Sequence, residues 1–271
     1  MIEKQLSSRL VAGIEDHYWV LVSLVPDVAG DLFIDPAALL AARAEMLGTF
    51  PMIIKPSNYS WYRAEVGRRR LLLSGSPSAA MWLAADLHHD GAGVFGVNVA
   101  DISRTADETR TNKVWLNDEQ IVNGILTGLR FLARHARDRA AASGGTLIRA
   151  RLYPLRSKQR ILLGTGARPD RERQGRQLQY RGGRDAESAA PLDALADDGP
   201  GLVAAAYLLA TDILQDFGLP EAPQVTRDGE LRSHYWGDGM LPGLRQWAAE
   251  AAVIVTDALM RGQENGQGPT Q

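Results

Sequence analysis

The chain has 271 residues, 45% of them hydrophobic and 23% charged, which is typical of a globular protein and excludes the disordered and fibrous classes. The formal net charge of -2 gives no overall signal for nucleic acid or membrane, and the absence of cysteine excludes disulfides, thiolate nucleophiles and cysteine-ligated metals. We find no signal peptide and no run of about 18 apolar residues. We therefore predict a cytoplasmic protein that does not associate with membranes.

The first hundred residues alternate between helical and strand-like patterns. Apolar spacing predicts a helix over 2–13, and Asp35-Pro36 is a typical start for a second helix that ends at Gly48. Runs of β-branched, aromatic and aliphatic residues predict five strands, with a turn at Gly67 and a hairpin at Asp90-Gly91. The predicted strands cover 18–25, 60–66, 68–74, 81–89 and 93–100.

The second half of the chain begins with the clearest helix, predicted over 117–142. Asn117 and Gln120 fit a capping box, and five apolar residues at helical spacing include Leu129, while Arg130 falls on the opposite side. The remaining predictions are a strand pair over 146–154 and 159–166, a polar excursion over 167–199, helices over 200–217 and 241–260, and a disordered tail over 262–271.

Strands occur in runs rather than alternating strictly with helices. This order predicts an α+β fold with a mostly antiparallel sheet and helices packed on one face. We expect one domain over 1–261, interrupted only by the polar excursion.

No motif in the chain indicates a catalytic site. The string Gly91-Ala-Gly93-Val-Phe-Gly96 matches the dinucleotide motif, but strand-like residues follow it where a helix is needed, so we interpret it as a hairpin turn. The chain has no P-loop string and no G-x-S-x-G elbow. We therefore predict no catalytic residue, no metal ligand and no cofactor.

His88-His89-Asp90 is the only dense group of metal-capable side chains in the sequence. Neighbouring residues of a strand point to opposite faces, so His88 and His89 cannot both bind one ion while the strand stays regular. We interpret the group as the polar tip of a hairpin, with a metal site as the alternative.

Arginine and lysine are concentrated between Arg149 and Arg184, a stretch that contains eleven basic residues and only two acidic ones. Arg149 and Arg151 alternate on a predicted strand, so their guanidinium groups share one face and could bind phosphates. The alternative is a solvated edge and loop, offset by the acidic segment 185–198. The candidate phosphate contacts are Arg68, Arg69, Arg70, Arg149, Arg151, Arg156, Lys158 and Arg160.

Several stretches together resemble the C-terminal region of high-GC bacterial proteins that carry an N-terminal Alba-like (Schlafen-type) domain associated with nucleic acids. These stretches are YWVLVSLVP from Tyr18, WYRAEVGRRR from Trp61, LHHDGAGVFGV from Leu87 and RARLYP from Arg149, and the resemblance covers about residues 1–165. The Alba-like half is absent from this sequence. The resemblance implies an accessory, sensing or partner-binding module and transfers no catalytic residue.

These observations favour a non-enzymatic accessory or interaction module that binds a protein partner or its own copies. The first alternative is a nucleic-acid-binding protein that uses the basic face. The second is a metal-dependent hydrolase built around His88, His89 and Asp90.

Overall fold

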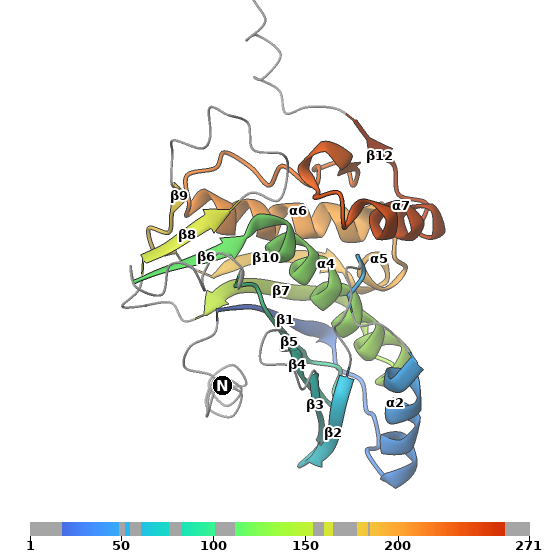
Figure 1. Ribbon diagram of the computed structural model, residues 1–271. Coiled ribbons are helices and arrows are strands. Elements are labelled where there is room, and N and C mark those ends of the chain that lie inside the picture. Colours follow the sequence, from blue (N-terminus) through green and yellow to red (C-terminus); the bar gives the residue numbers. More distant parts are fainter. Residues whose placement is uncertain are drawn as a thin grey trace, which may run out of the picture.

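The computed structural model describes residues 18–48, 52–54, 61–75, 83–100, 112–153, 160–164, 178–183 and 185–257. It confirms the α+β class with a mostly antiparallel sheet (Figure 1). Seven strands form the main sheet, and every neighbouring pair is antiparallel. Their spatial order is β10 (Ala186–Pro191), β7 (Ser143–Tyr153), β1 (Trp19–Val28), β5 (Gly93–Asn98), β4 (Leu83–His88), β3 (Arg70–Gly75) and β2 (Trp61–Gly67).

One face of this sheet packs against helices α4 (Asp118–Arg134), α5 (Leu192–Ala196) and α6 (Pro200–Gln215). α4 lies close to β1 and β5 because two of its residues have no side chain. A Cβ atom at Gly124 would come within 2.6 Å of Val97 Cγ1, and one at Gly128 would come within 2.8 Å of Val22 Cβ. The α4 residue Leu129 is fully buried in this layer, as the apolar stripe predicted.

The start of α4 is capped by Asn117, as predicted, but without the predicted capping box. Asn117 Oδ1 accepts a hydrogen bond from the Glu119 backbone N–H at 3.0 Å. The Asn117 backbone N–H, which Gln120 would have to satisfy, instead donates to the Val99 carbonyl at 3.3 Å. The carbonyl of Val99, the residue just after β5, therefore takes the place of the second half of the box.

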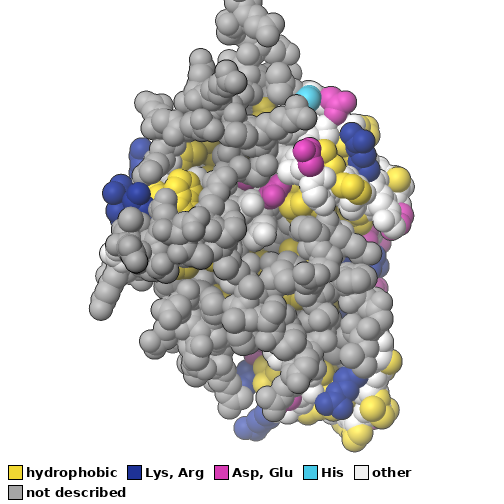
Figure 2. Space-filling model, in the orientation of Figure 1, with side chains coloured by type: hydrophobic (Ala, Val, Ile, Leu, Met, Phe, Trp, Pro, Cys, Tyr) yellow, Lys and Arg dark blue, Asp and Glu magenta, His cyan; other side chains and the backbone are white. Residues whose placement is uncertain are grey.

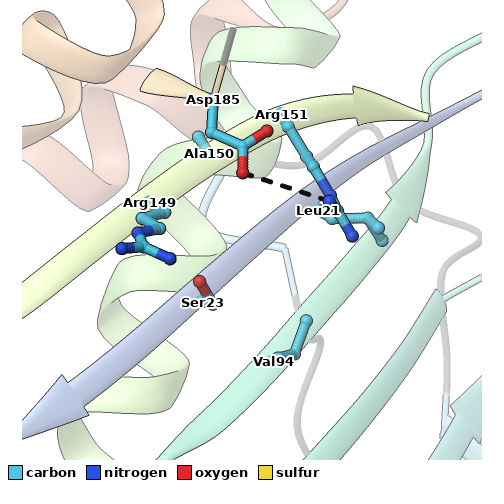
Figure 3. A pocket seen from close by; sticks show the side chains of 7 residues that line it. All are labelled: Leu21, Ser23, Val94, Arg149, Ala150, Arg151 and Asp185. Atoms are coloured by element: carbon cyan, nitrogen blue, oxygen red, sulfur yellow. Dashed lines mark ion pairs between the residues drawn. The ribbon is translucent and has the colours of Figure 1, made fainter. Parts of the chain in front are cut away.

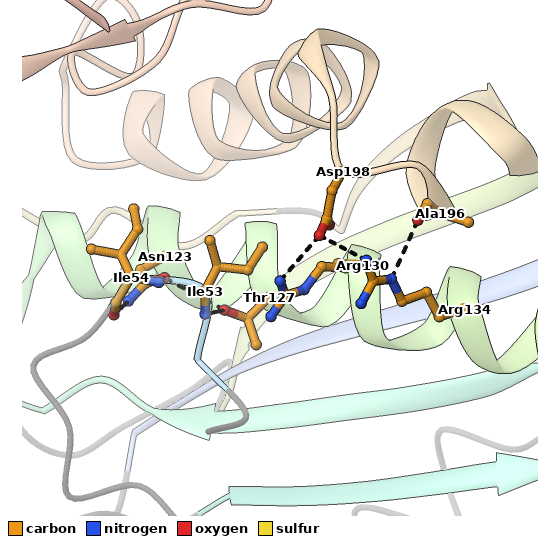
Figure 4. A network of polar contacts seen from close by, with 8 residues as sticks. All are labelled: Ile53, Ile54, Asn123, Thr127, Arg130, Arg134, Ala196 and Asp198. Atoms are coloured by element: carbon orange, nitrogen blue, oxygen red, sulfur yellow. Dashed lines mark hydrogen bonds and ion pairs between the residues drawn. The ribbon is translucent and has the colours of Figure 1, made fainter. Parts of the chain in front are cut away.

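Buried polar side chains on α4 hold a short irregular segment, 52–54, on the core (Figure 4). Asn123 accepts from the Ile54 N–H at 3.2 Å and donates to the Ile54 carbonyl at 2.8 Å, and Thr127 accepts from the Ile53 N–H at 3.0 Å. These bonds satisfy backbone groups that would otherwise be buried without partners. They join the core to the connection between α2 (Pro36–Gly48) and β2.

A second, three-stranded sheet contains β6 (Lys113–Asn117), β8 (Arg160–Gly164) and β9 (Leu178–Gln179). The predicted pairing of strands 146–154 and 159–166 is wrong. β7 already has β1 on one side and β10 on the other, so β8 pairs in parallel with β6 and antiparallel with β9.

The predicted excursion over 167–199 is wrong in its second part. Residues 185–199 supply the edge strand β10 and the helix α5, where Leu192 and Leu195 are buried in the main core. Alanine, serine and acidic residues dominate this stretch, and their low strand propensity hides the strand. Residues 165–177 and 184 lie outside the described residues, as do the predicted helix over 2–13 and the tail over 262–271.

The last helix, α7 (Leu241–Glu250), is shorter than predicted. Ala252 adopts φ +52°, and the Val253 N–H donates to the Ala248 carbonyl at 2.8 Å, which is a Schellman-type ending with alanine in place of glycine. Ile254, which the predicted helix over 241–260 would include, lies beyond its end and is 59% exposed. β12 (Val255–Thr256) pairs with β11 (Leu231–Arg232).

Candidate interaction surface

The outer face, as we name the side of the seven-stranded sheet opposite α4, carries a different set of side chains from the core face. Alternation along β1 places Val20 and Val22 in the main core, and Trp19, Leu21 and Ser23 on the outer face. Strand register extends this face across the sheet, since Ser23 lies opposite both Val94 on β5 and Arg149 on β7.

A small depression lies on this face near β1, β5 and β7 (Figure 3). Leu21 and Val94 supply its apolar surface, and Ser23 adds a hydroxyl. Arg149 and Arg151 lie along its β7 side, with Asp185, just before β10, beside Arg151. The arrangement combines an apolar floor with charged groups of both signs, which suits a ligand surface of mixed polarity.

Three arginines among the described side chains of the outer face, Arg70, Arg149 and Arg151, each lie beside a carboxylate. Arg149 Nε lies 2.5 Å from Glu187 Oε2, and Arg151 Nη1 lies 4.0 Å from Asp185 Oδ2. Farther along the sheet, Arg70 Nη1 contacts Asp86 Oδ2 at 2.8 Å, and Asp86 is only 1% exposed. The pairs neutralise the positive field that a phosphate backbone would need.

The other predicted phosphate contacts within the described residues do not gather around the depression. Arg70 shares the outer face with Arg149, because Arg70 lies opposite His88 on β4, but three strands separate β3 from β7, a span of about 19 Å. Arg68 and Arg69 occupy the exposed turn between β2 and β3. Arg160 belongs to the smaller sheet and donates to Gln179 at 2.9 Å. Arg156 and Lys158 lie outside the described residues.

The three residues His88, His89 and Asp90 lie beside different groups. His88 Nε2 lies 3.7 Å from Asp86 on the outer face, while His89 Nδ1 lies 3.4 Å from Asp31. Asp90 closes the hairpin by accepting from the Ala92 N–H at 2.9 Å, and Gly91 has the positive φ of +92° that the turn requires. Gly93 and Gly96 lie in or at the start of the strand β5, so the glycine string is the hairpin that we predicted.

Within the described ranges, no group of three or more histidine, aspartate or glutamate side chains could hold a metal ion. None of the described helices is long and apolar enough to cross a membrane.

The sequence analysis did not identify Asp185 and Glu187, the acidic residues beside the arginines of the outer face. Asp185 and Glu187 are spaced two residues apart, as are Arg149 and Arg151, so each pair projects from one face of its strand. Matching i, i+2 charges of opposite sign are a signal for neighbouring strands. The signal was overlooked because 185–198 was expected to lie in a loop.

No protein-family model, no curated protein and no solved structure matches this chain. The resemblance to the Alba-associated bacterial proteins accordingly stays a prediction.

Proposed function

We propose that this protein is a non-enzymatic interaction module that binds a protein partner through the outer-face depression. The observation that carries the proposal is the meeting of an apolar floor, Leu21 and Val94, with the paired charges of Arg149 and Arg151. Protein interfaces commonly combine an apolar centre with arginine and a polar rim. Nucleic-acid interfaces are strongly positive, and here the arginines already have acidic neighbours.

Affinity capture with the purified chain tests this proposal. We expect a specific protein to be retained from a lysate of the source organism, and to be lost when Ser23→Arg fills the depression. The matched control is Arg245→Ala on the exposed side of α7, which should leave retention unchanged. Recombinant partner and purified chain should then reproduce the binding and its loss.

A gel shift with duplex and single-stranded nucleic acid distinguishes protein binding from the main alternative, which is nucleic-acid binding. Phosphate-driven binding is strong at about 50 mM salt and falls by orders of magnitude by about 200 mM. Retention at low salt that is weakened by Arg149→Ala with Arg151→Ala would assign the surface to nucleic acid. Capture that is unchanged by Ser23→Arg would also refute the proposal.

A further inference from the structure

The outer face of β7 and β10 carries basic residues on one strand and acidic residues beside them. Arg149 lies opposite Glu187 in the register of the two strands, and the same register continued by two residues sets Arg151 opposite Asp185. Figure 3 shows both arginines and Asp185 on the same side of the sheet. The face therefore has two successive rows, each with a positive charge on β7 and a negative charge on the β10 side.

The Arg149–Glu187 pair keeps groups that can bind a second partner. Among the described residues, the pair uses only Nε of Arg149 and Oε2 of Glu187, which leaves Nη1 and Nη2 of the arginine and Oε1 of the glutamate. The two side chains are 39% and 49% exposed. The described helices that pack on these strands, α5 and α6, lie on the core face, and β10 is the last strand of the sheet. A second molecule can therefore reach both charges.

A face with this charge pattern is complementary to itself. A two-fold axis parallel to the strands, midway between β7 and β10, turns a second sheet over and sets β7 of each copy above β10 of the other. Positions along the strands do not change in this rotation, so Arg149 of each copy meets Glu187 of the other, and Arg151 meets Asp185. Sheets packed face to face lie about 10 Å apart, a gap that an arginine and a glutamate side chain span together.

The next row along the two strands is complementary in size. Leu147 lies opposite Ala189 on the outer face, where Leu147 is half-buried and Ala189 is exposed. The same rotation sets the leucine of each copy above the small alanine of the other, so the two sheets can approach without two large side chains meeting. This row adds apolar contact, which exposed ion pairs alone do not supply.

We propose that the outer face of β7 and β10 is a homodimer interface, on which a second copy of this chain packs the same two strands with this two-fold symmetry. The charged rows fix the orientation of the copies, and the apolar row adds affinity. Arg149 and Arg151 border both this interface and the depression. The floor of the depression, Leu21 and Val94, lies outside the overlap of the two sheets, so the contact goes beyond the proposed function and can fail independently of it.

The balance of charges favours a second copy over a nucleic acid. The two rows hold two arginines and two carboxylates, so their net charge is zero. A phosphate backbone would meet the carboxylates as well as the arginines and would be repelled by them. A second copy, in contrast, meets each positive charge with a negative one.

Sedimentation equilibrium over about a hundredfold range of concentration, up to about 1 mM, tests the dimer. We expect the unmodified chain to dimerise reversibly. The dissociation constant should rise about threefold or more between about 50 and 500 mM salt, because salt screens the opposite charges. A chain that stays monomeric up to about 1 mM would overturn the proposal.

A charge-swap variant tests the arrangement of the two copies. Arg149→Glu combined with Glu187→Arg keeps an opposite-charge pair within the chain, and the two-fold rotation again sets opposite charges against each other, so the variant should dimerise with itself. Mixed with the unmodified chain, it sets like charges against each other. The heterodimer, followed by a fluorescent label on one chain, should therefore be about tenfold weaker or more than either homodimer. Heterodimers that form as readily as homodimers would contradict the contact.

Two single substitutions separate this contact from other surfaces. Ala189 is exposed, so Ala189→Lys should fold normally, but it sets a charged side chain against Leu147 of the second copy and should raise the dissociation constant about tenfold or more. The control is Leu40→Asp on α2, where Figure 2 shows hydrophobic side chains and Leu40 is 63% exposed. It should leave the dissociation constant unchanged.

Circular dichroism checks that each variant is folded, and Ala189→Lys decides the question if the charge-swap variant is not. A dimer that Leu40→Asp breaks and Ala189→Lys leaves intact would place the contact on α2 and overturn the proposal. Loss of lysate capture in Ser23→Arg tests the depression separately, because Ser23 on β1 lies outside the overlap of the two sheets.

Discussion

His135 is fully buried where the end of α4 meets the β4–β5 hairpin. Its Nε2 atom lies 2.7 Å from the His88 carbonyl oxygen, which can only accept, so Nε2 carries the proton of the neutral ring. Burial lowers the pKa of His135 from 6.5 to about 4, with the nearby Arg139 lowering it further and the His88 carbonyl and Asp90 opposing the change. The imidazole therefore stays uncharged in the folded protein near neutral pH.

This lowered pKa predicts a pH-dependent loss of stability. The unfolded chain binds a proton at His135 below about pH 6.5, whereas the folded chain does so only near pH 4, so the stability contributed above pH 6.5 is lost as pH falls through about 4. The total loss should be about 3 kcal/mol. His135→Gln keeps an N–H donor but cannot titrate, and urea unfolding should show a shallower decline for it between pH 6.5 and 4. An identical decline in both proteins would contradict the assignment.

At the scale of the element, Arg130 on α4 corrects one sequence-based expectation. Helical periodicity places Arg130 opposite the apolar stripe, but its Nη1 atom lies 3.3 Å from Asp198 Oδ2 and its side chain is only 18% exposed (Figure 4). Arg134 contacts the same oxygen at 2.8 Å. The two arginines thus tie α4 to the turn between α5 and α6, a contact that helical periodicity alone cannot reveal.

The two faces of α4 should therefore both be sensitive to alanine, but to different degrees. Leu129→Ala removes a fully buried side chain and leaves a cavity, so unfolding free energy should fall by about 2–5 kcal/mol. Arg130→Ala should cost about 1 kcal/mol, because Arg134 still pairs with Asp198. Thermal melts measure both, with the exposed Arg245→Ala on α7 as a control expected within about 0.5 kcal/mol. Equal melting temperatures for Arg130→Ala and the control would show that the ion pair contributes nothing.

Elements with strong local signals were predicted well from the sequence. The stripe through Leu129, the hairpin at Asp90-Gly91 and the strand from Trp19 all depend on periodicity or turn chemistry within a few residues. The ends of elements were harder, because tertiary contacts decide them. Val99 completes the cap of α4, and a backbone bond to Ala248 ends α7.

At the scale of the whole molecule, strand partners were the least predictable feature. Sequence proximity favoured pairing β7 with β8, but β1 and β10 occupy both edges of β7. The pairing of β10 with β7 brings Glu187 to Arg149. The basic residues of the candidate surface could therefore be predicted from the sequence, but their acidic neighbours could not. Arg149 and Arg151 do share a face, as alternation required, while the acids that change the meaning of that face come from a strand far along the chain.

Substitutions in the segment 185–199, near the C-terminal end of the chain, test whether the core includes this segment. If it were a mobile excursion, substitutions there would have little effect on stability. Leu195 on α5 is instead fully buried in a cluster that runs from Tyr18 to Val253. Leu195→Ala should therefore lower the unfolding free energy by about 2–5 kcal/mol, close to the effect of Leu129→Ala.

Asp193→Ala is the matched control for that substitution. It lies in the same short helix, but its side chain is 79% exposed, so the change should stay within about 0.5 kcal/mol. Urea unfolding followed by circular dichroism measures both variants. The urea concentration at the unfolding midpoint should be well below that of Asp193→Ala for the Leu195→Ala variant, because only the Leu195 substitution removes atoms from the core. Equal urea midpoints for the two variants would show that α5 contributes no more to the core than an exposed loop, as the predicted excursion over 167–199 implies.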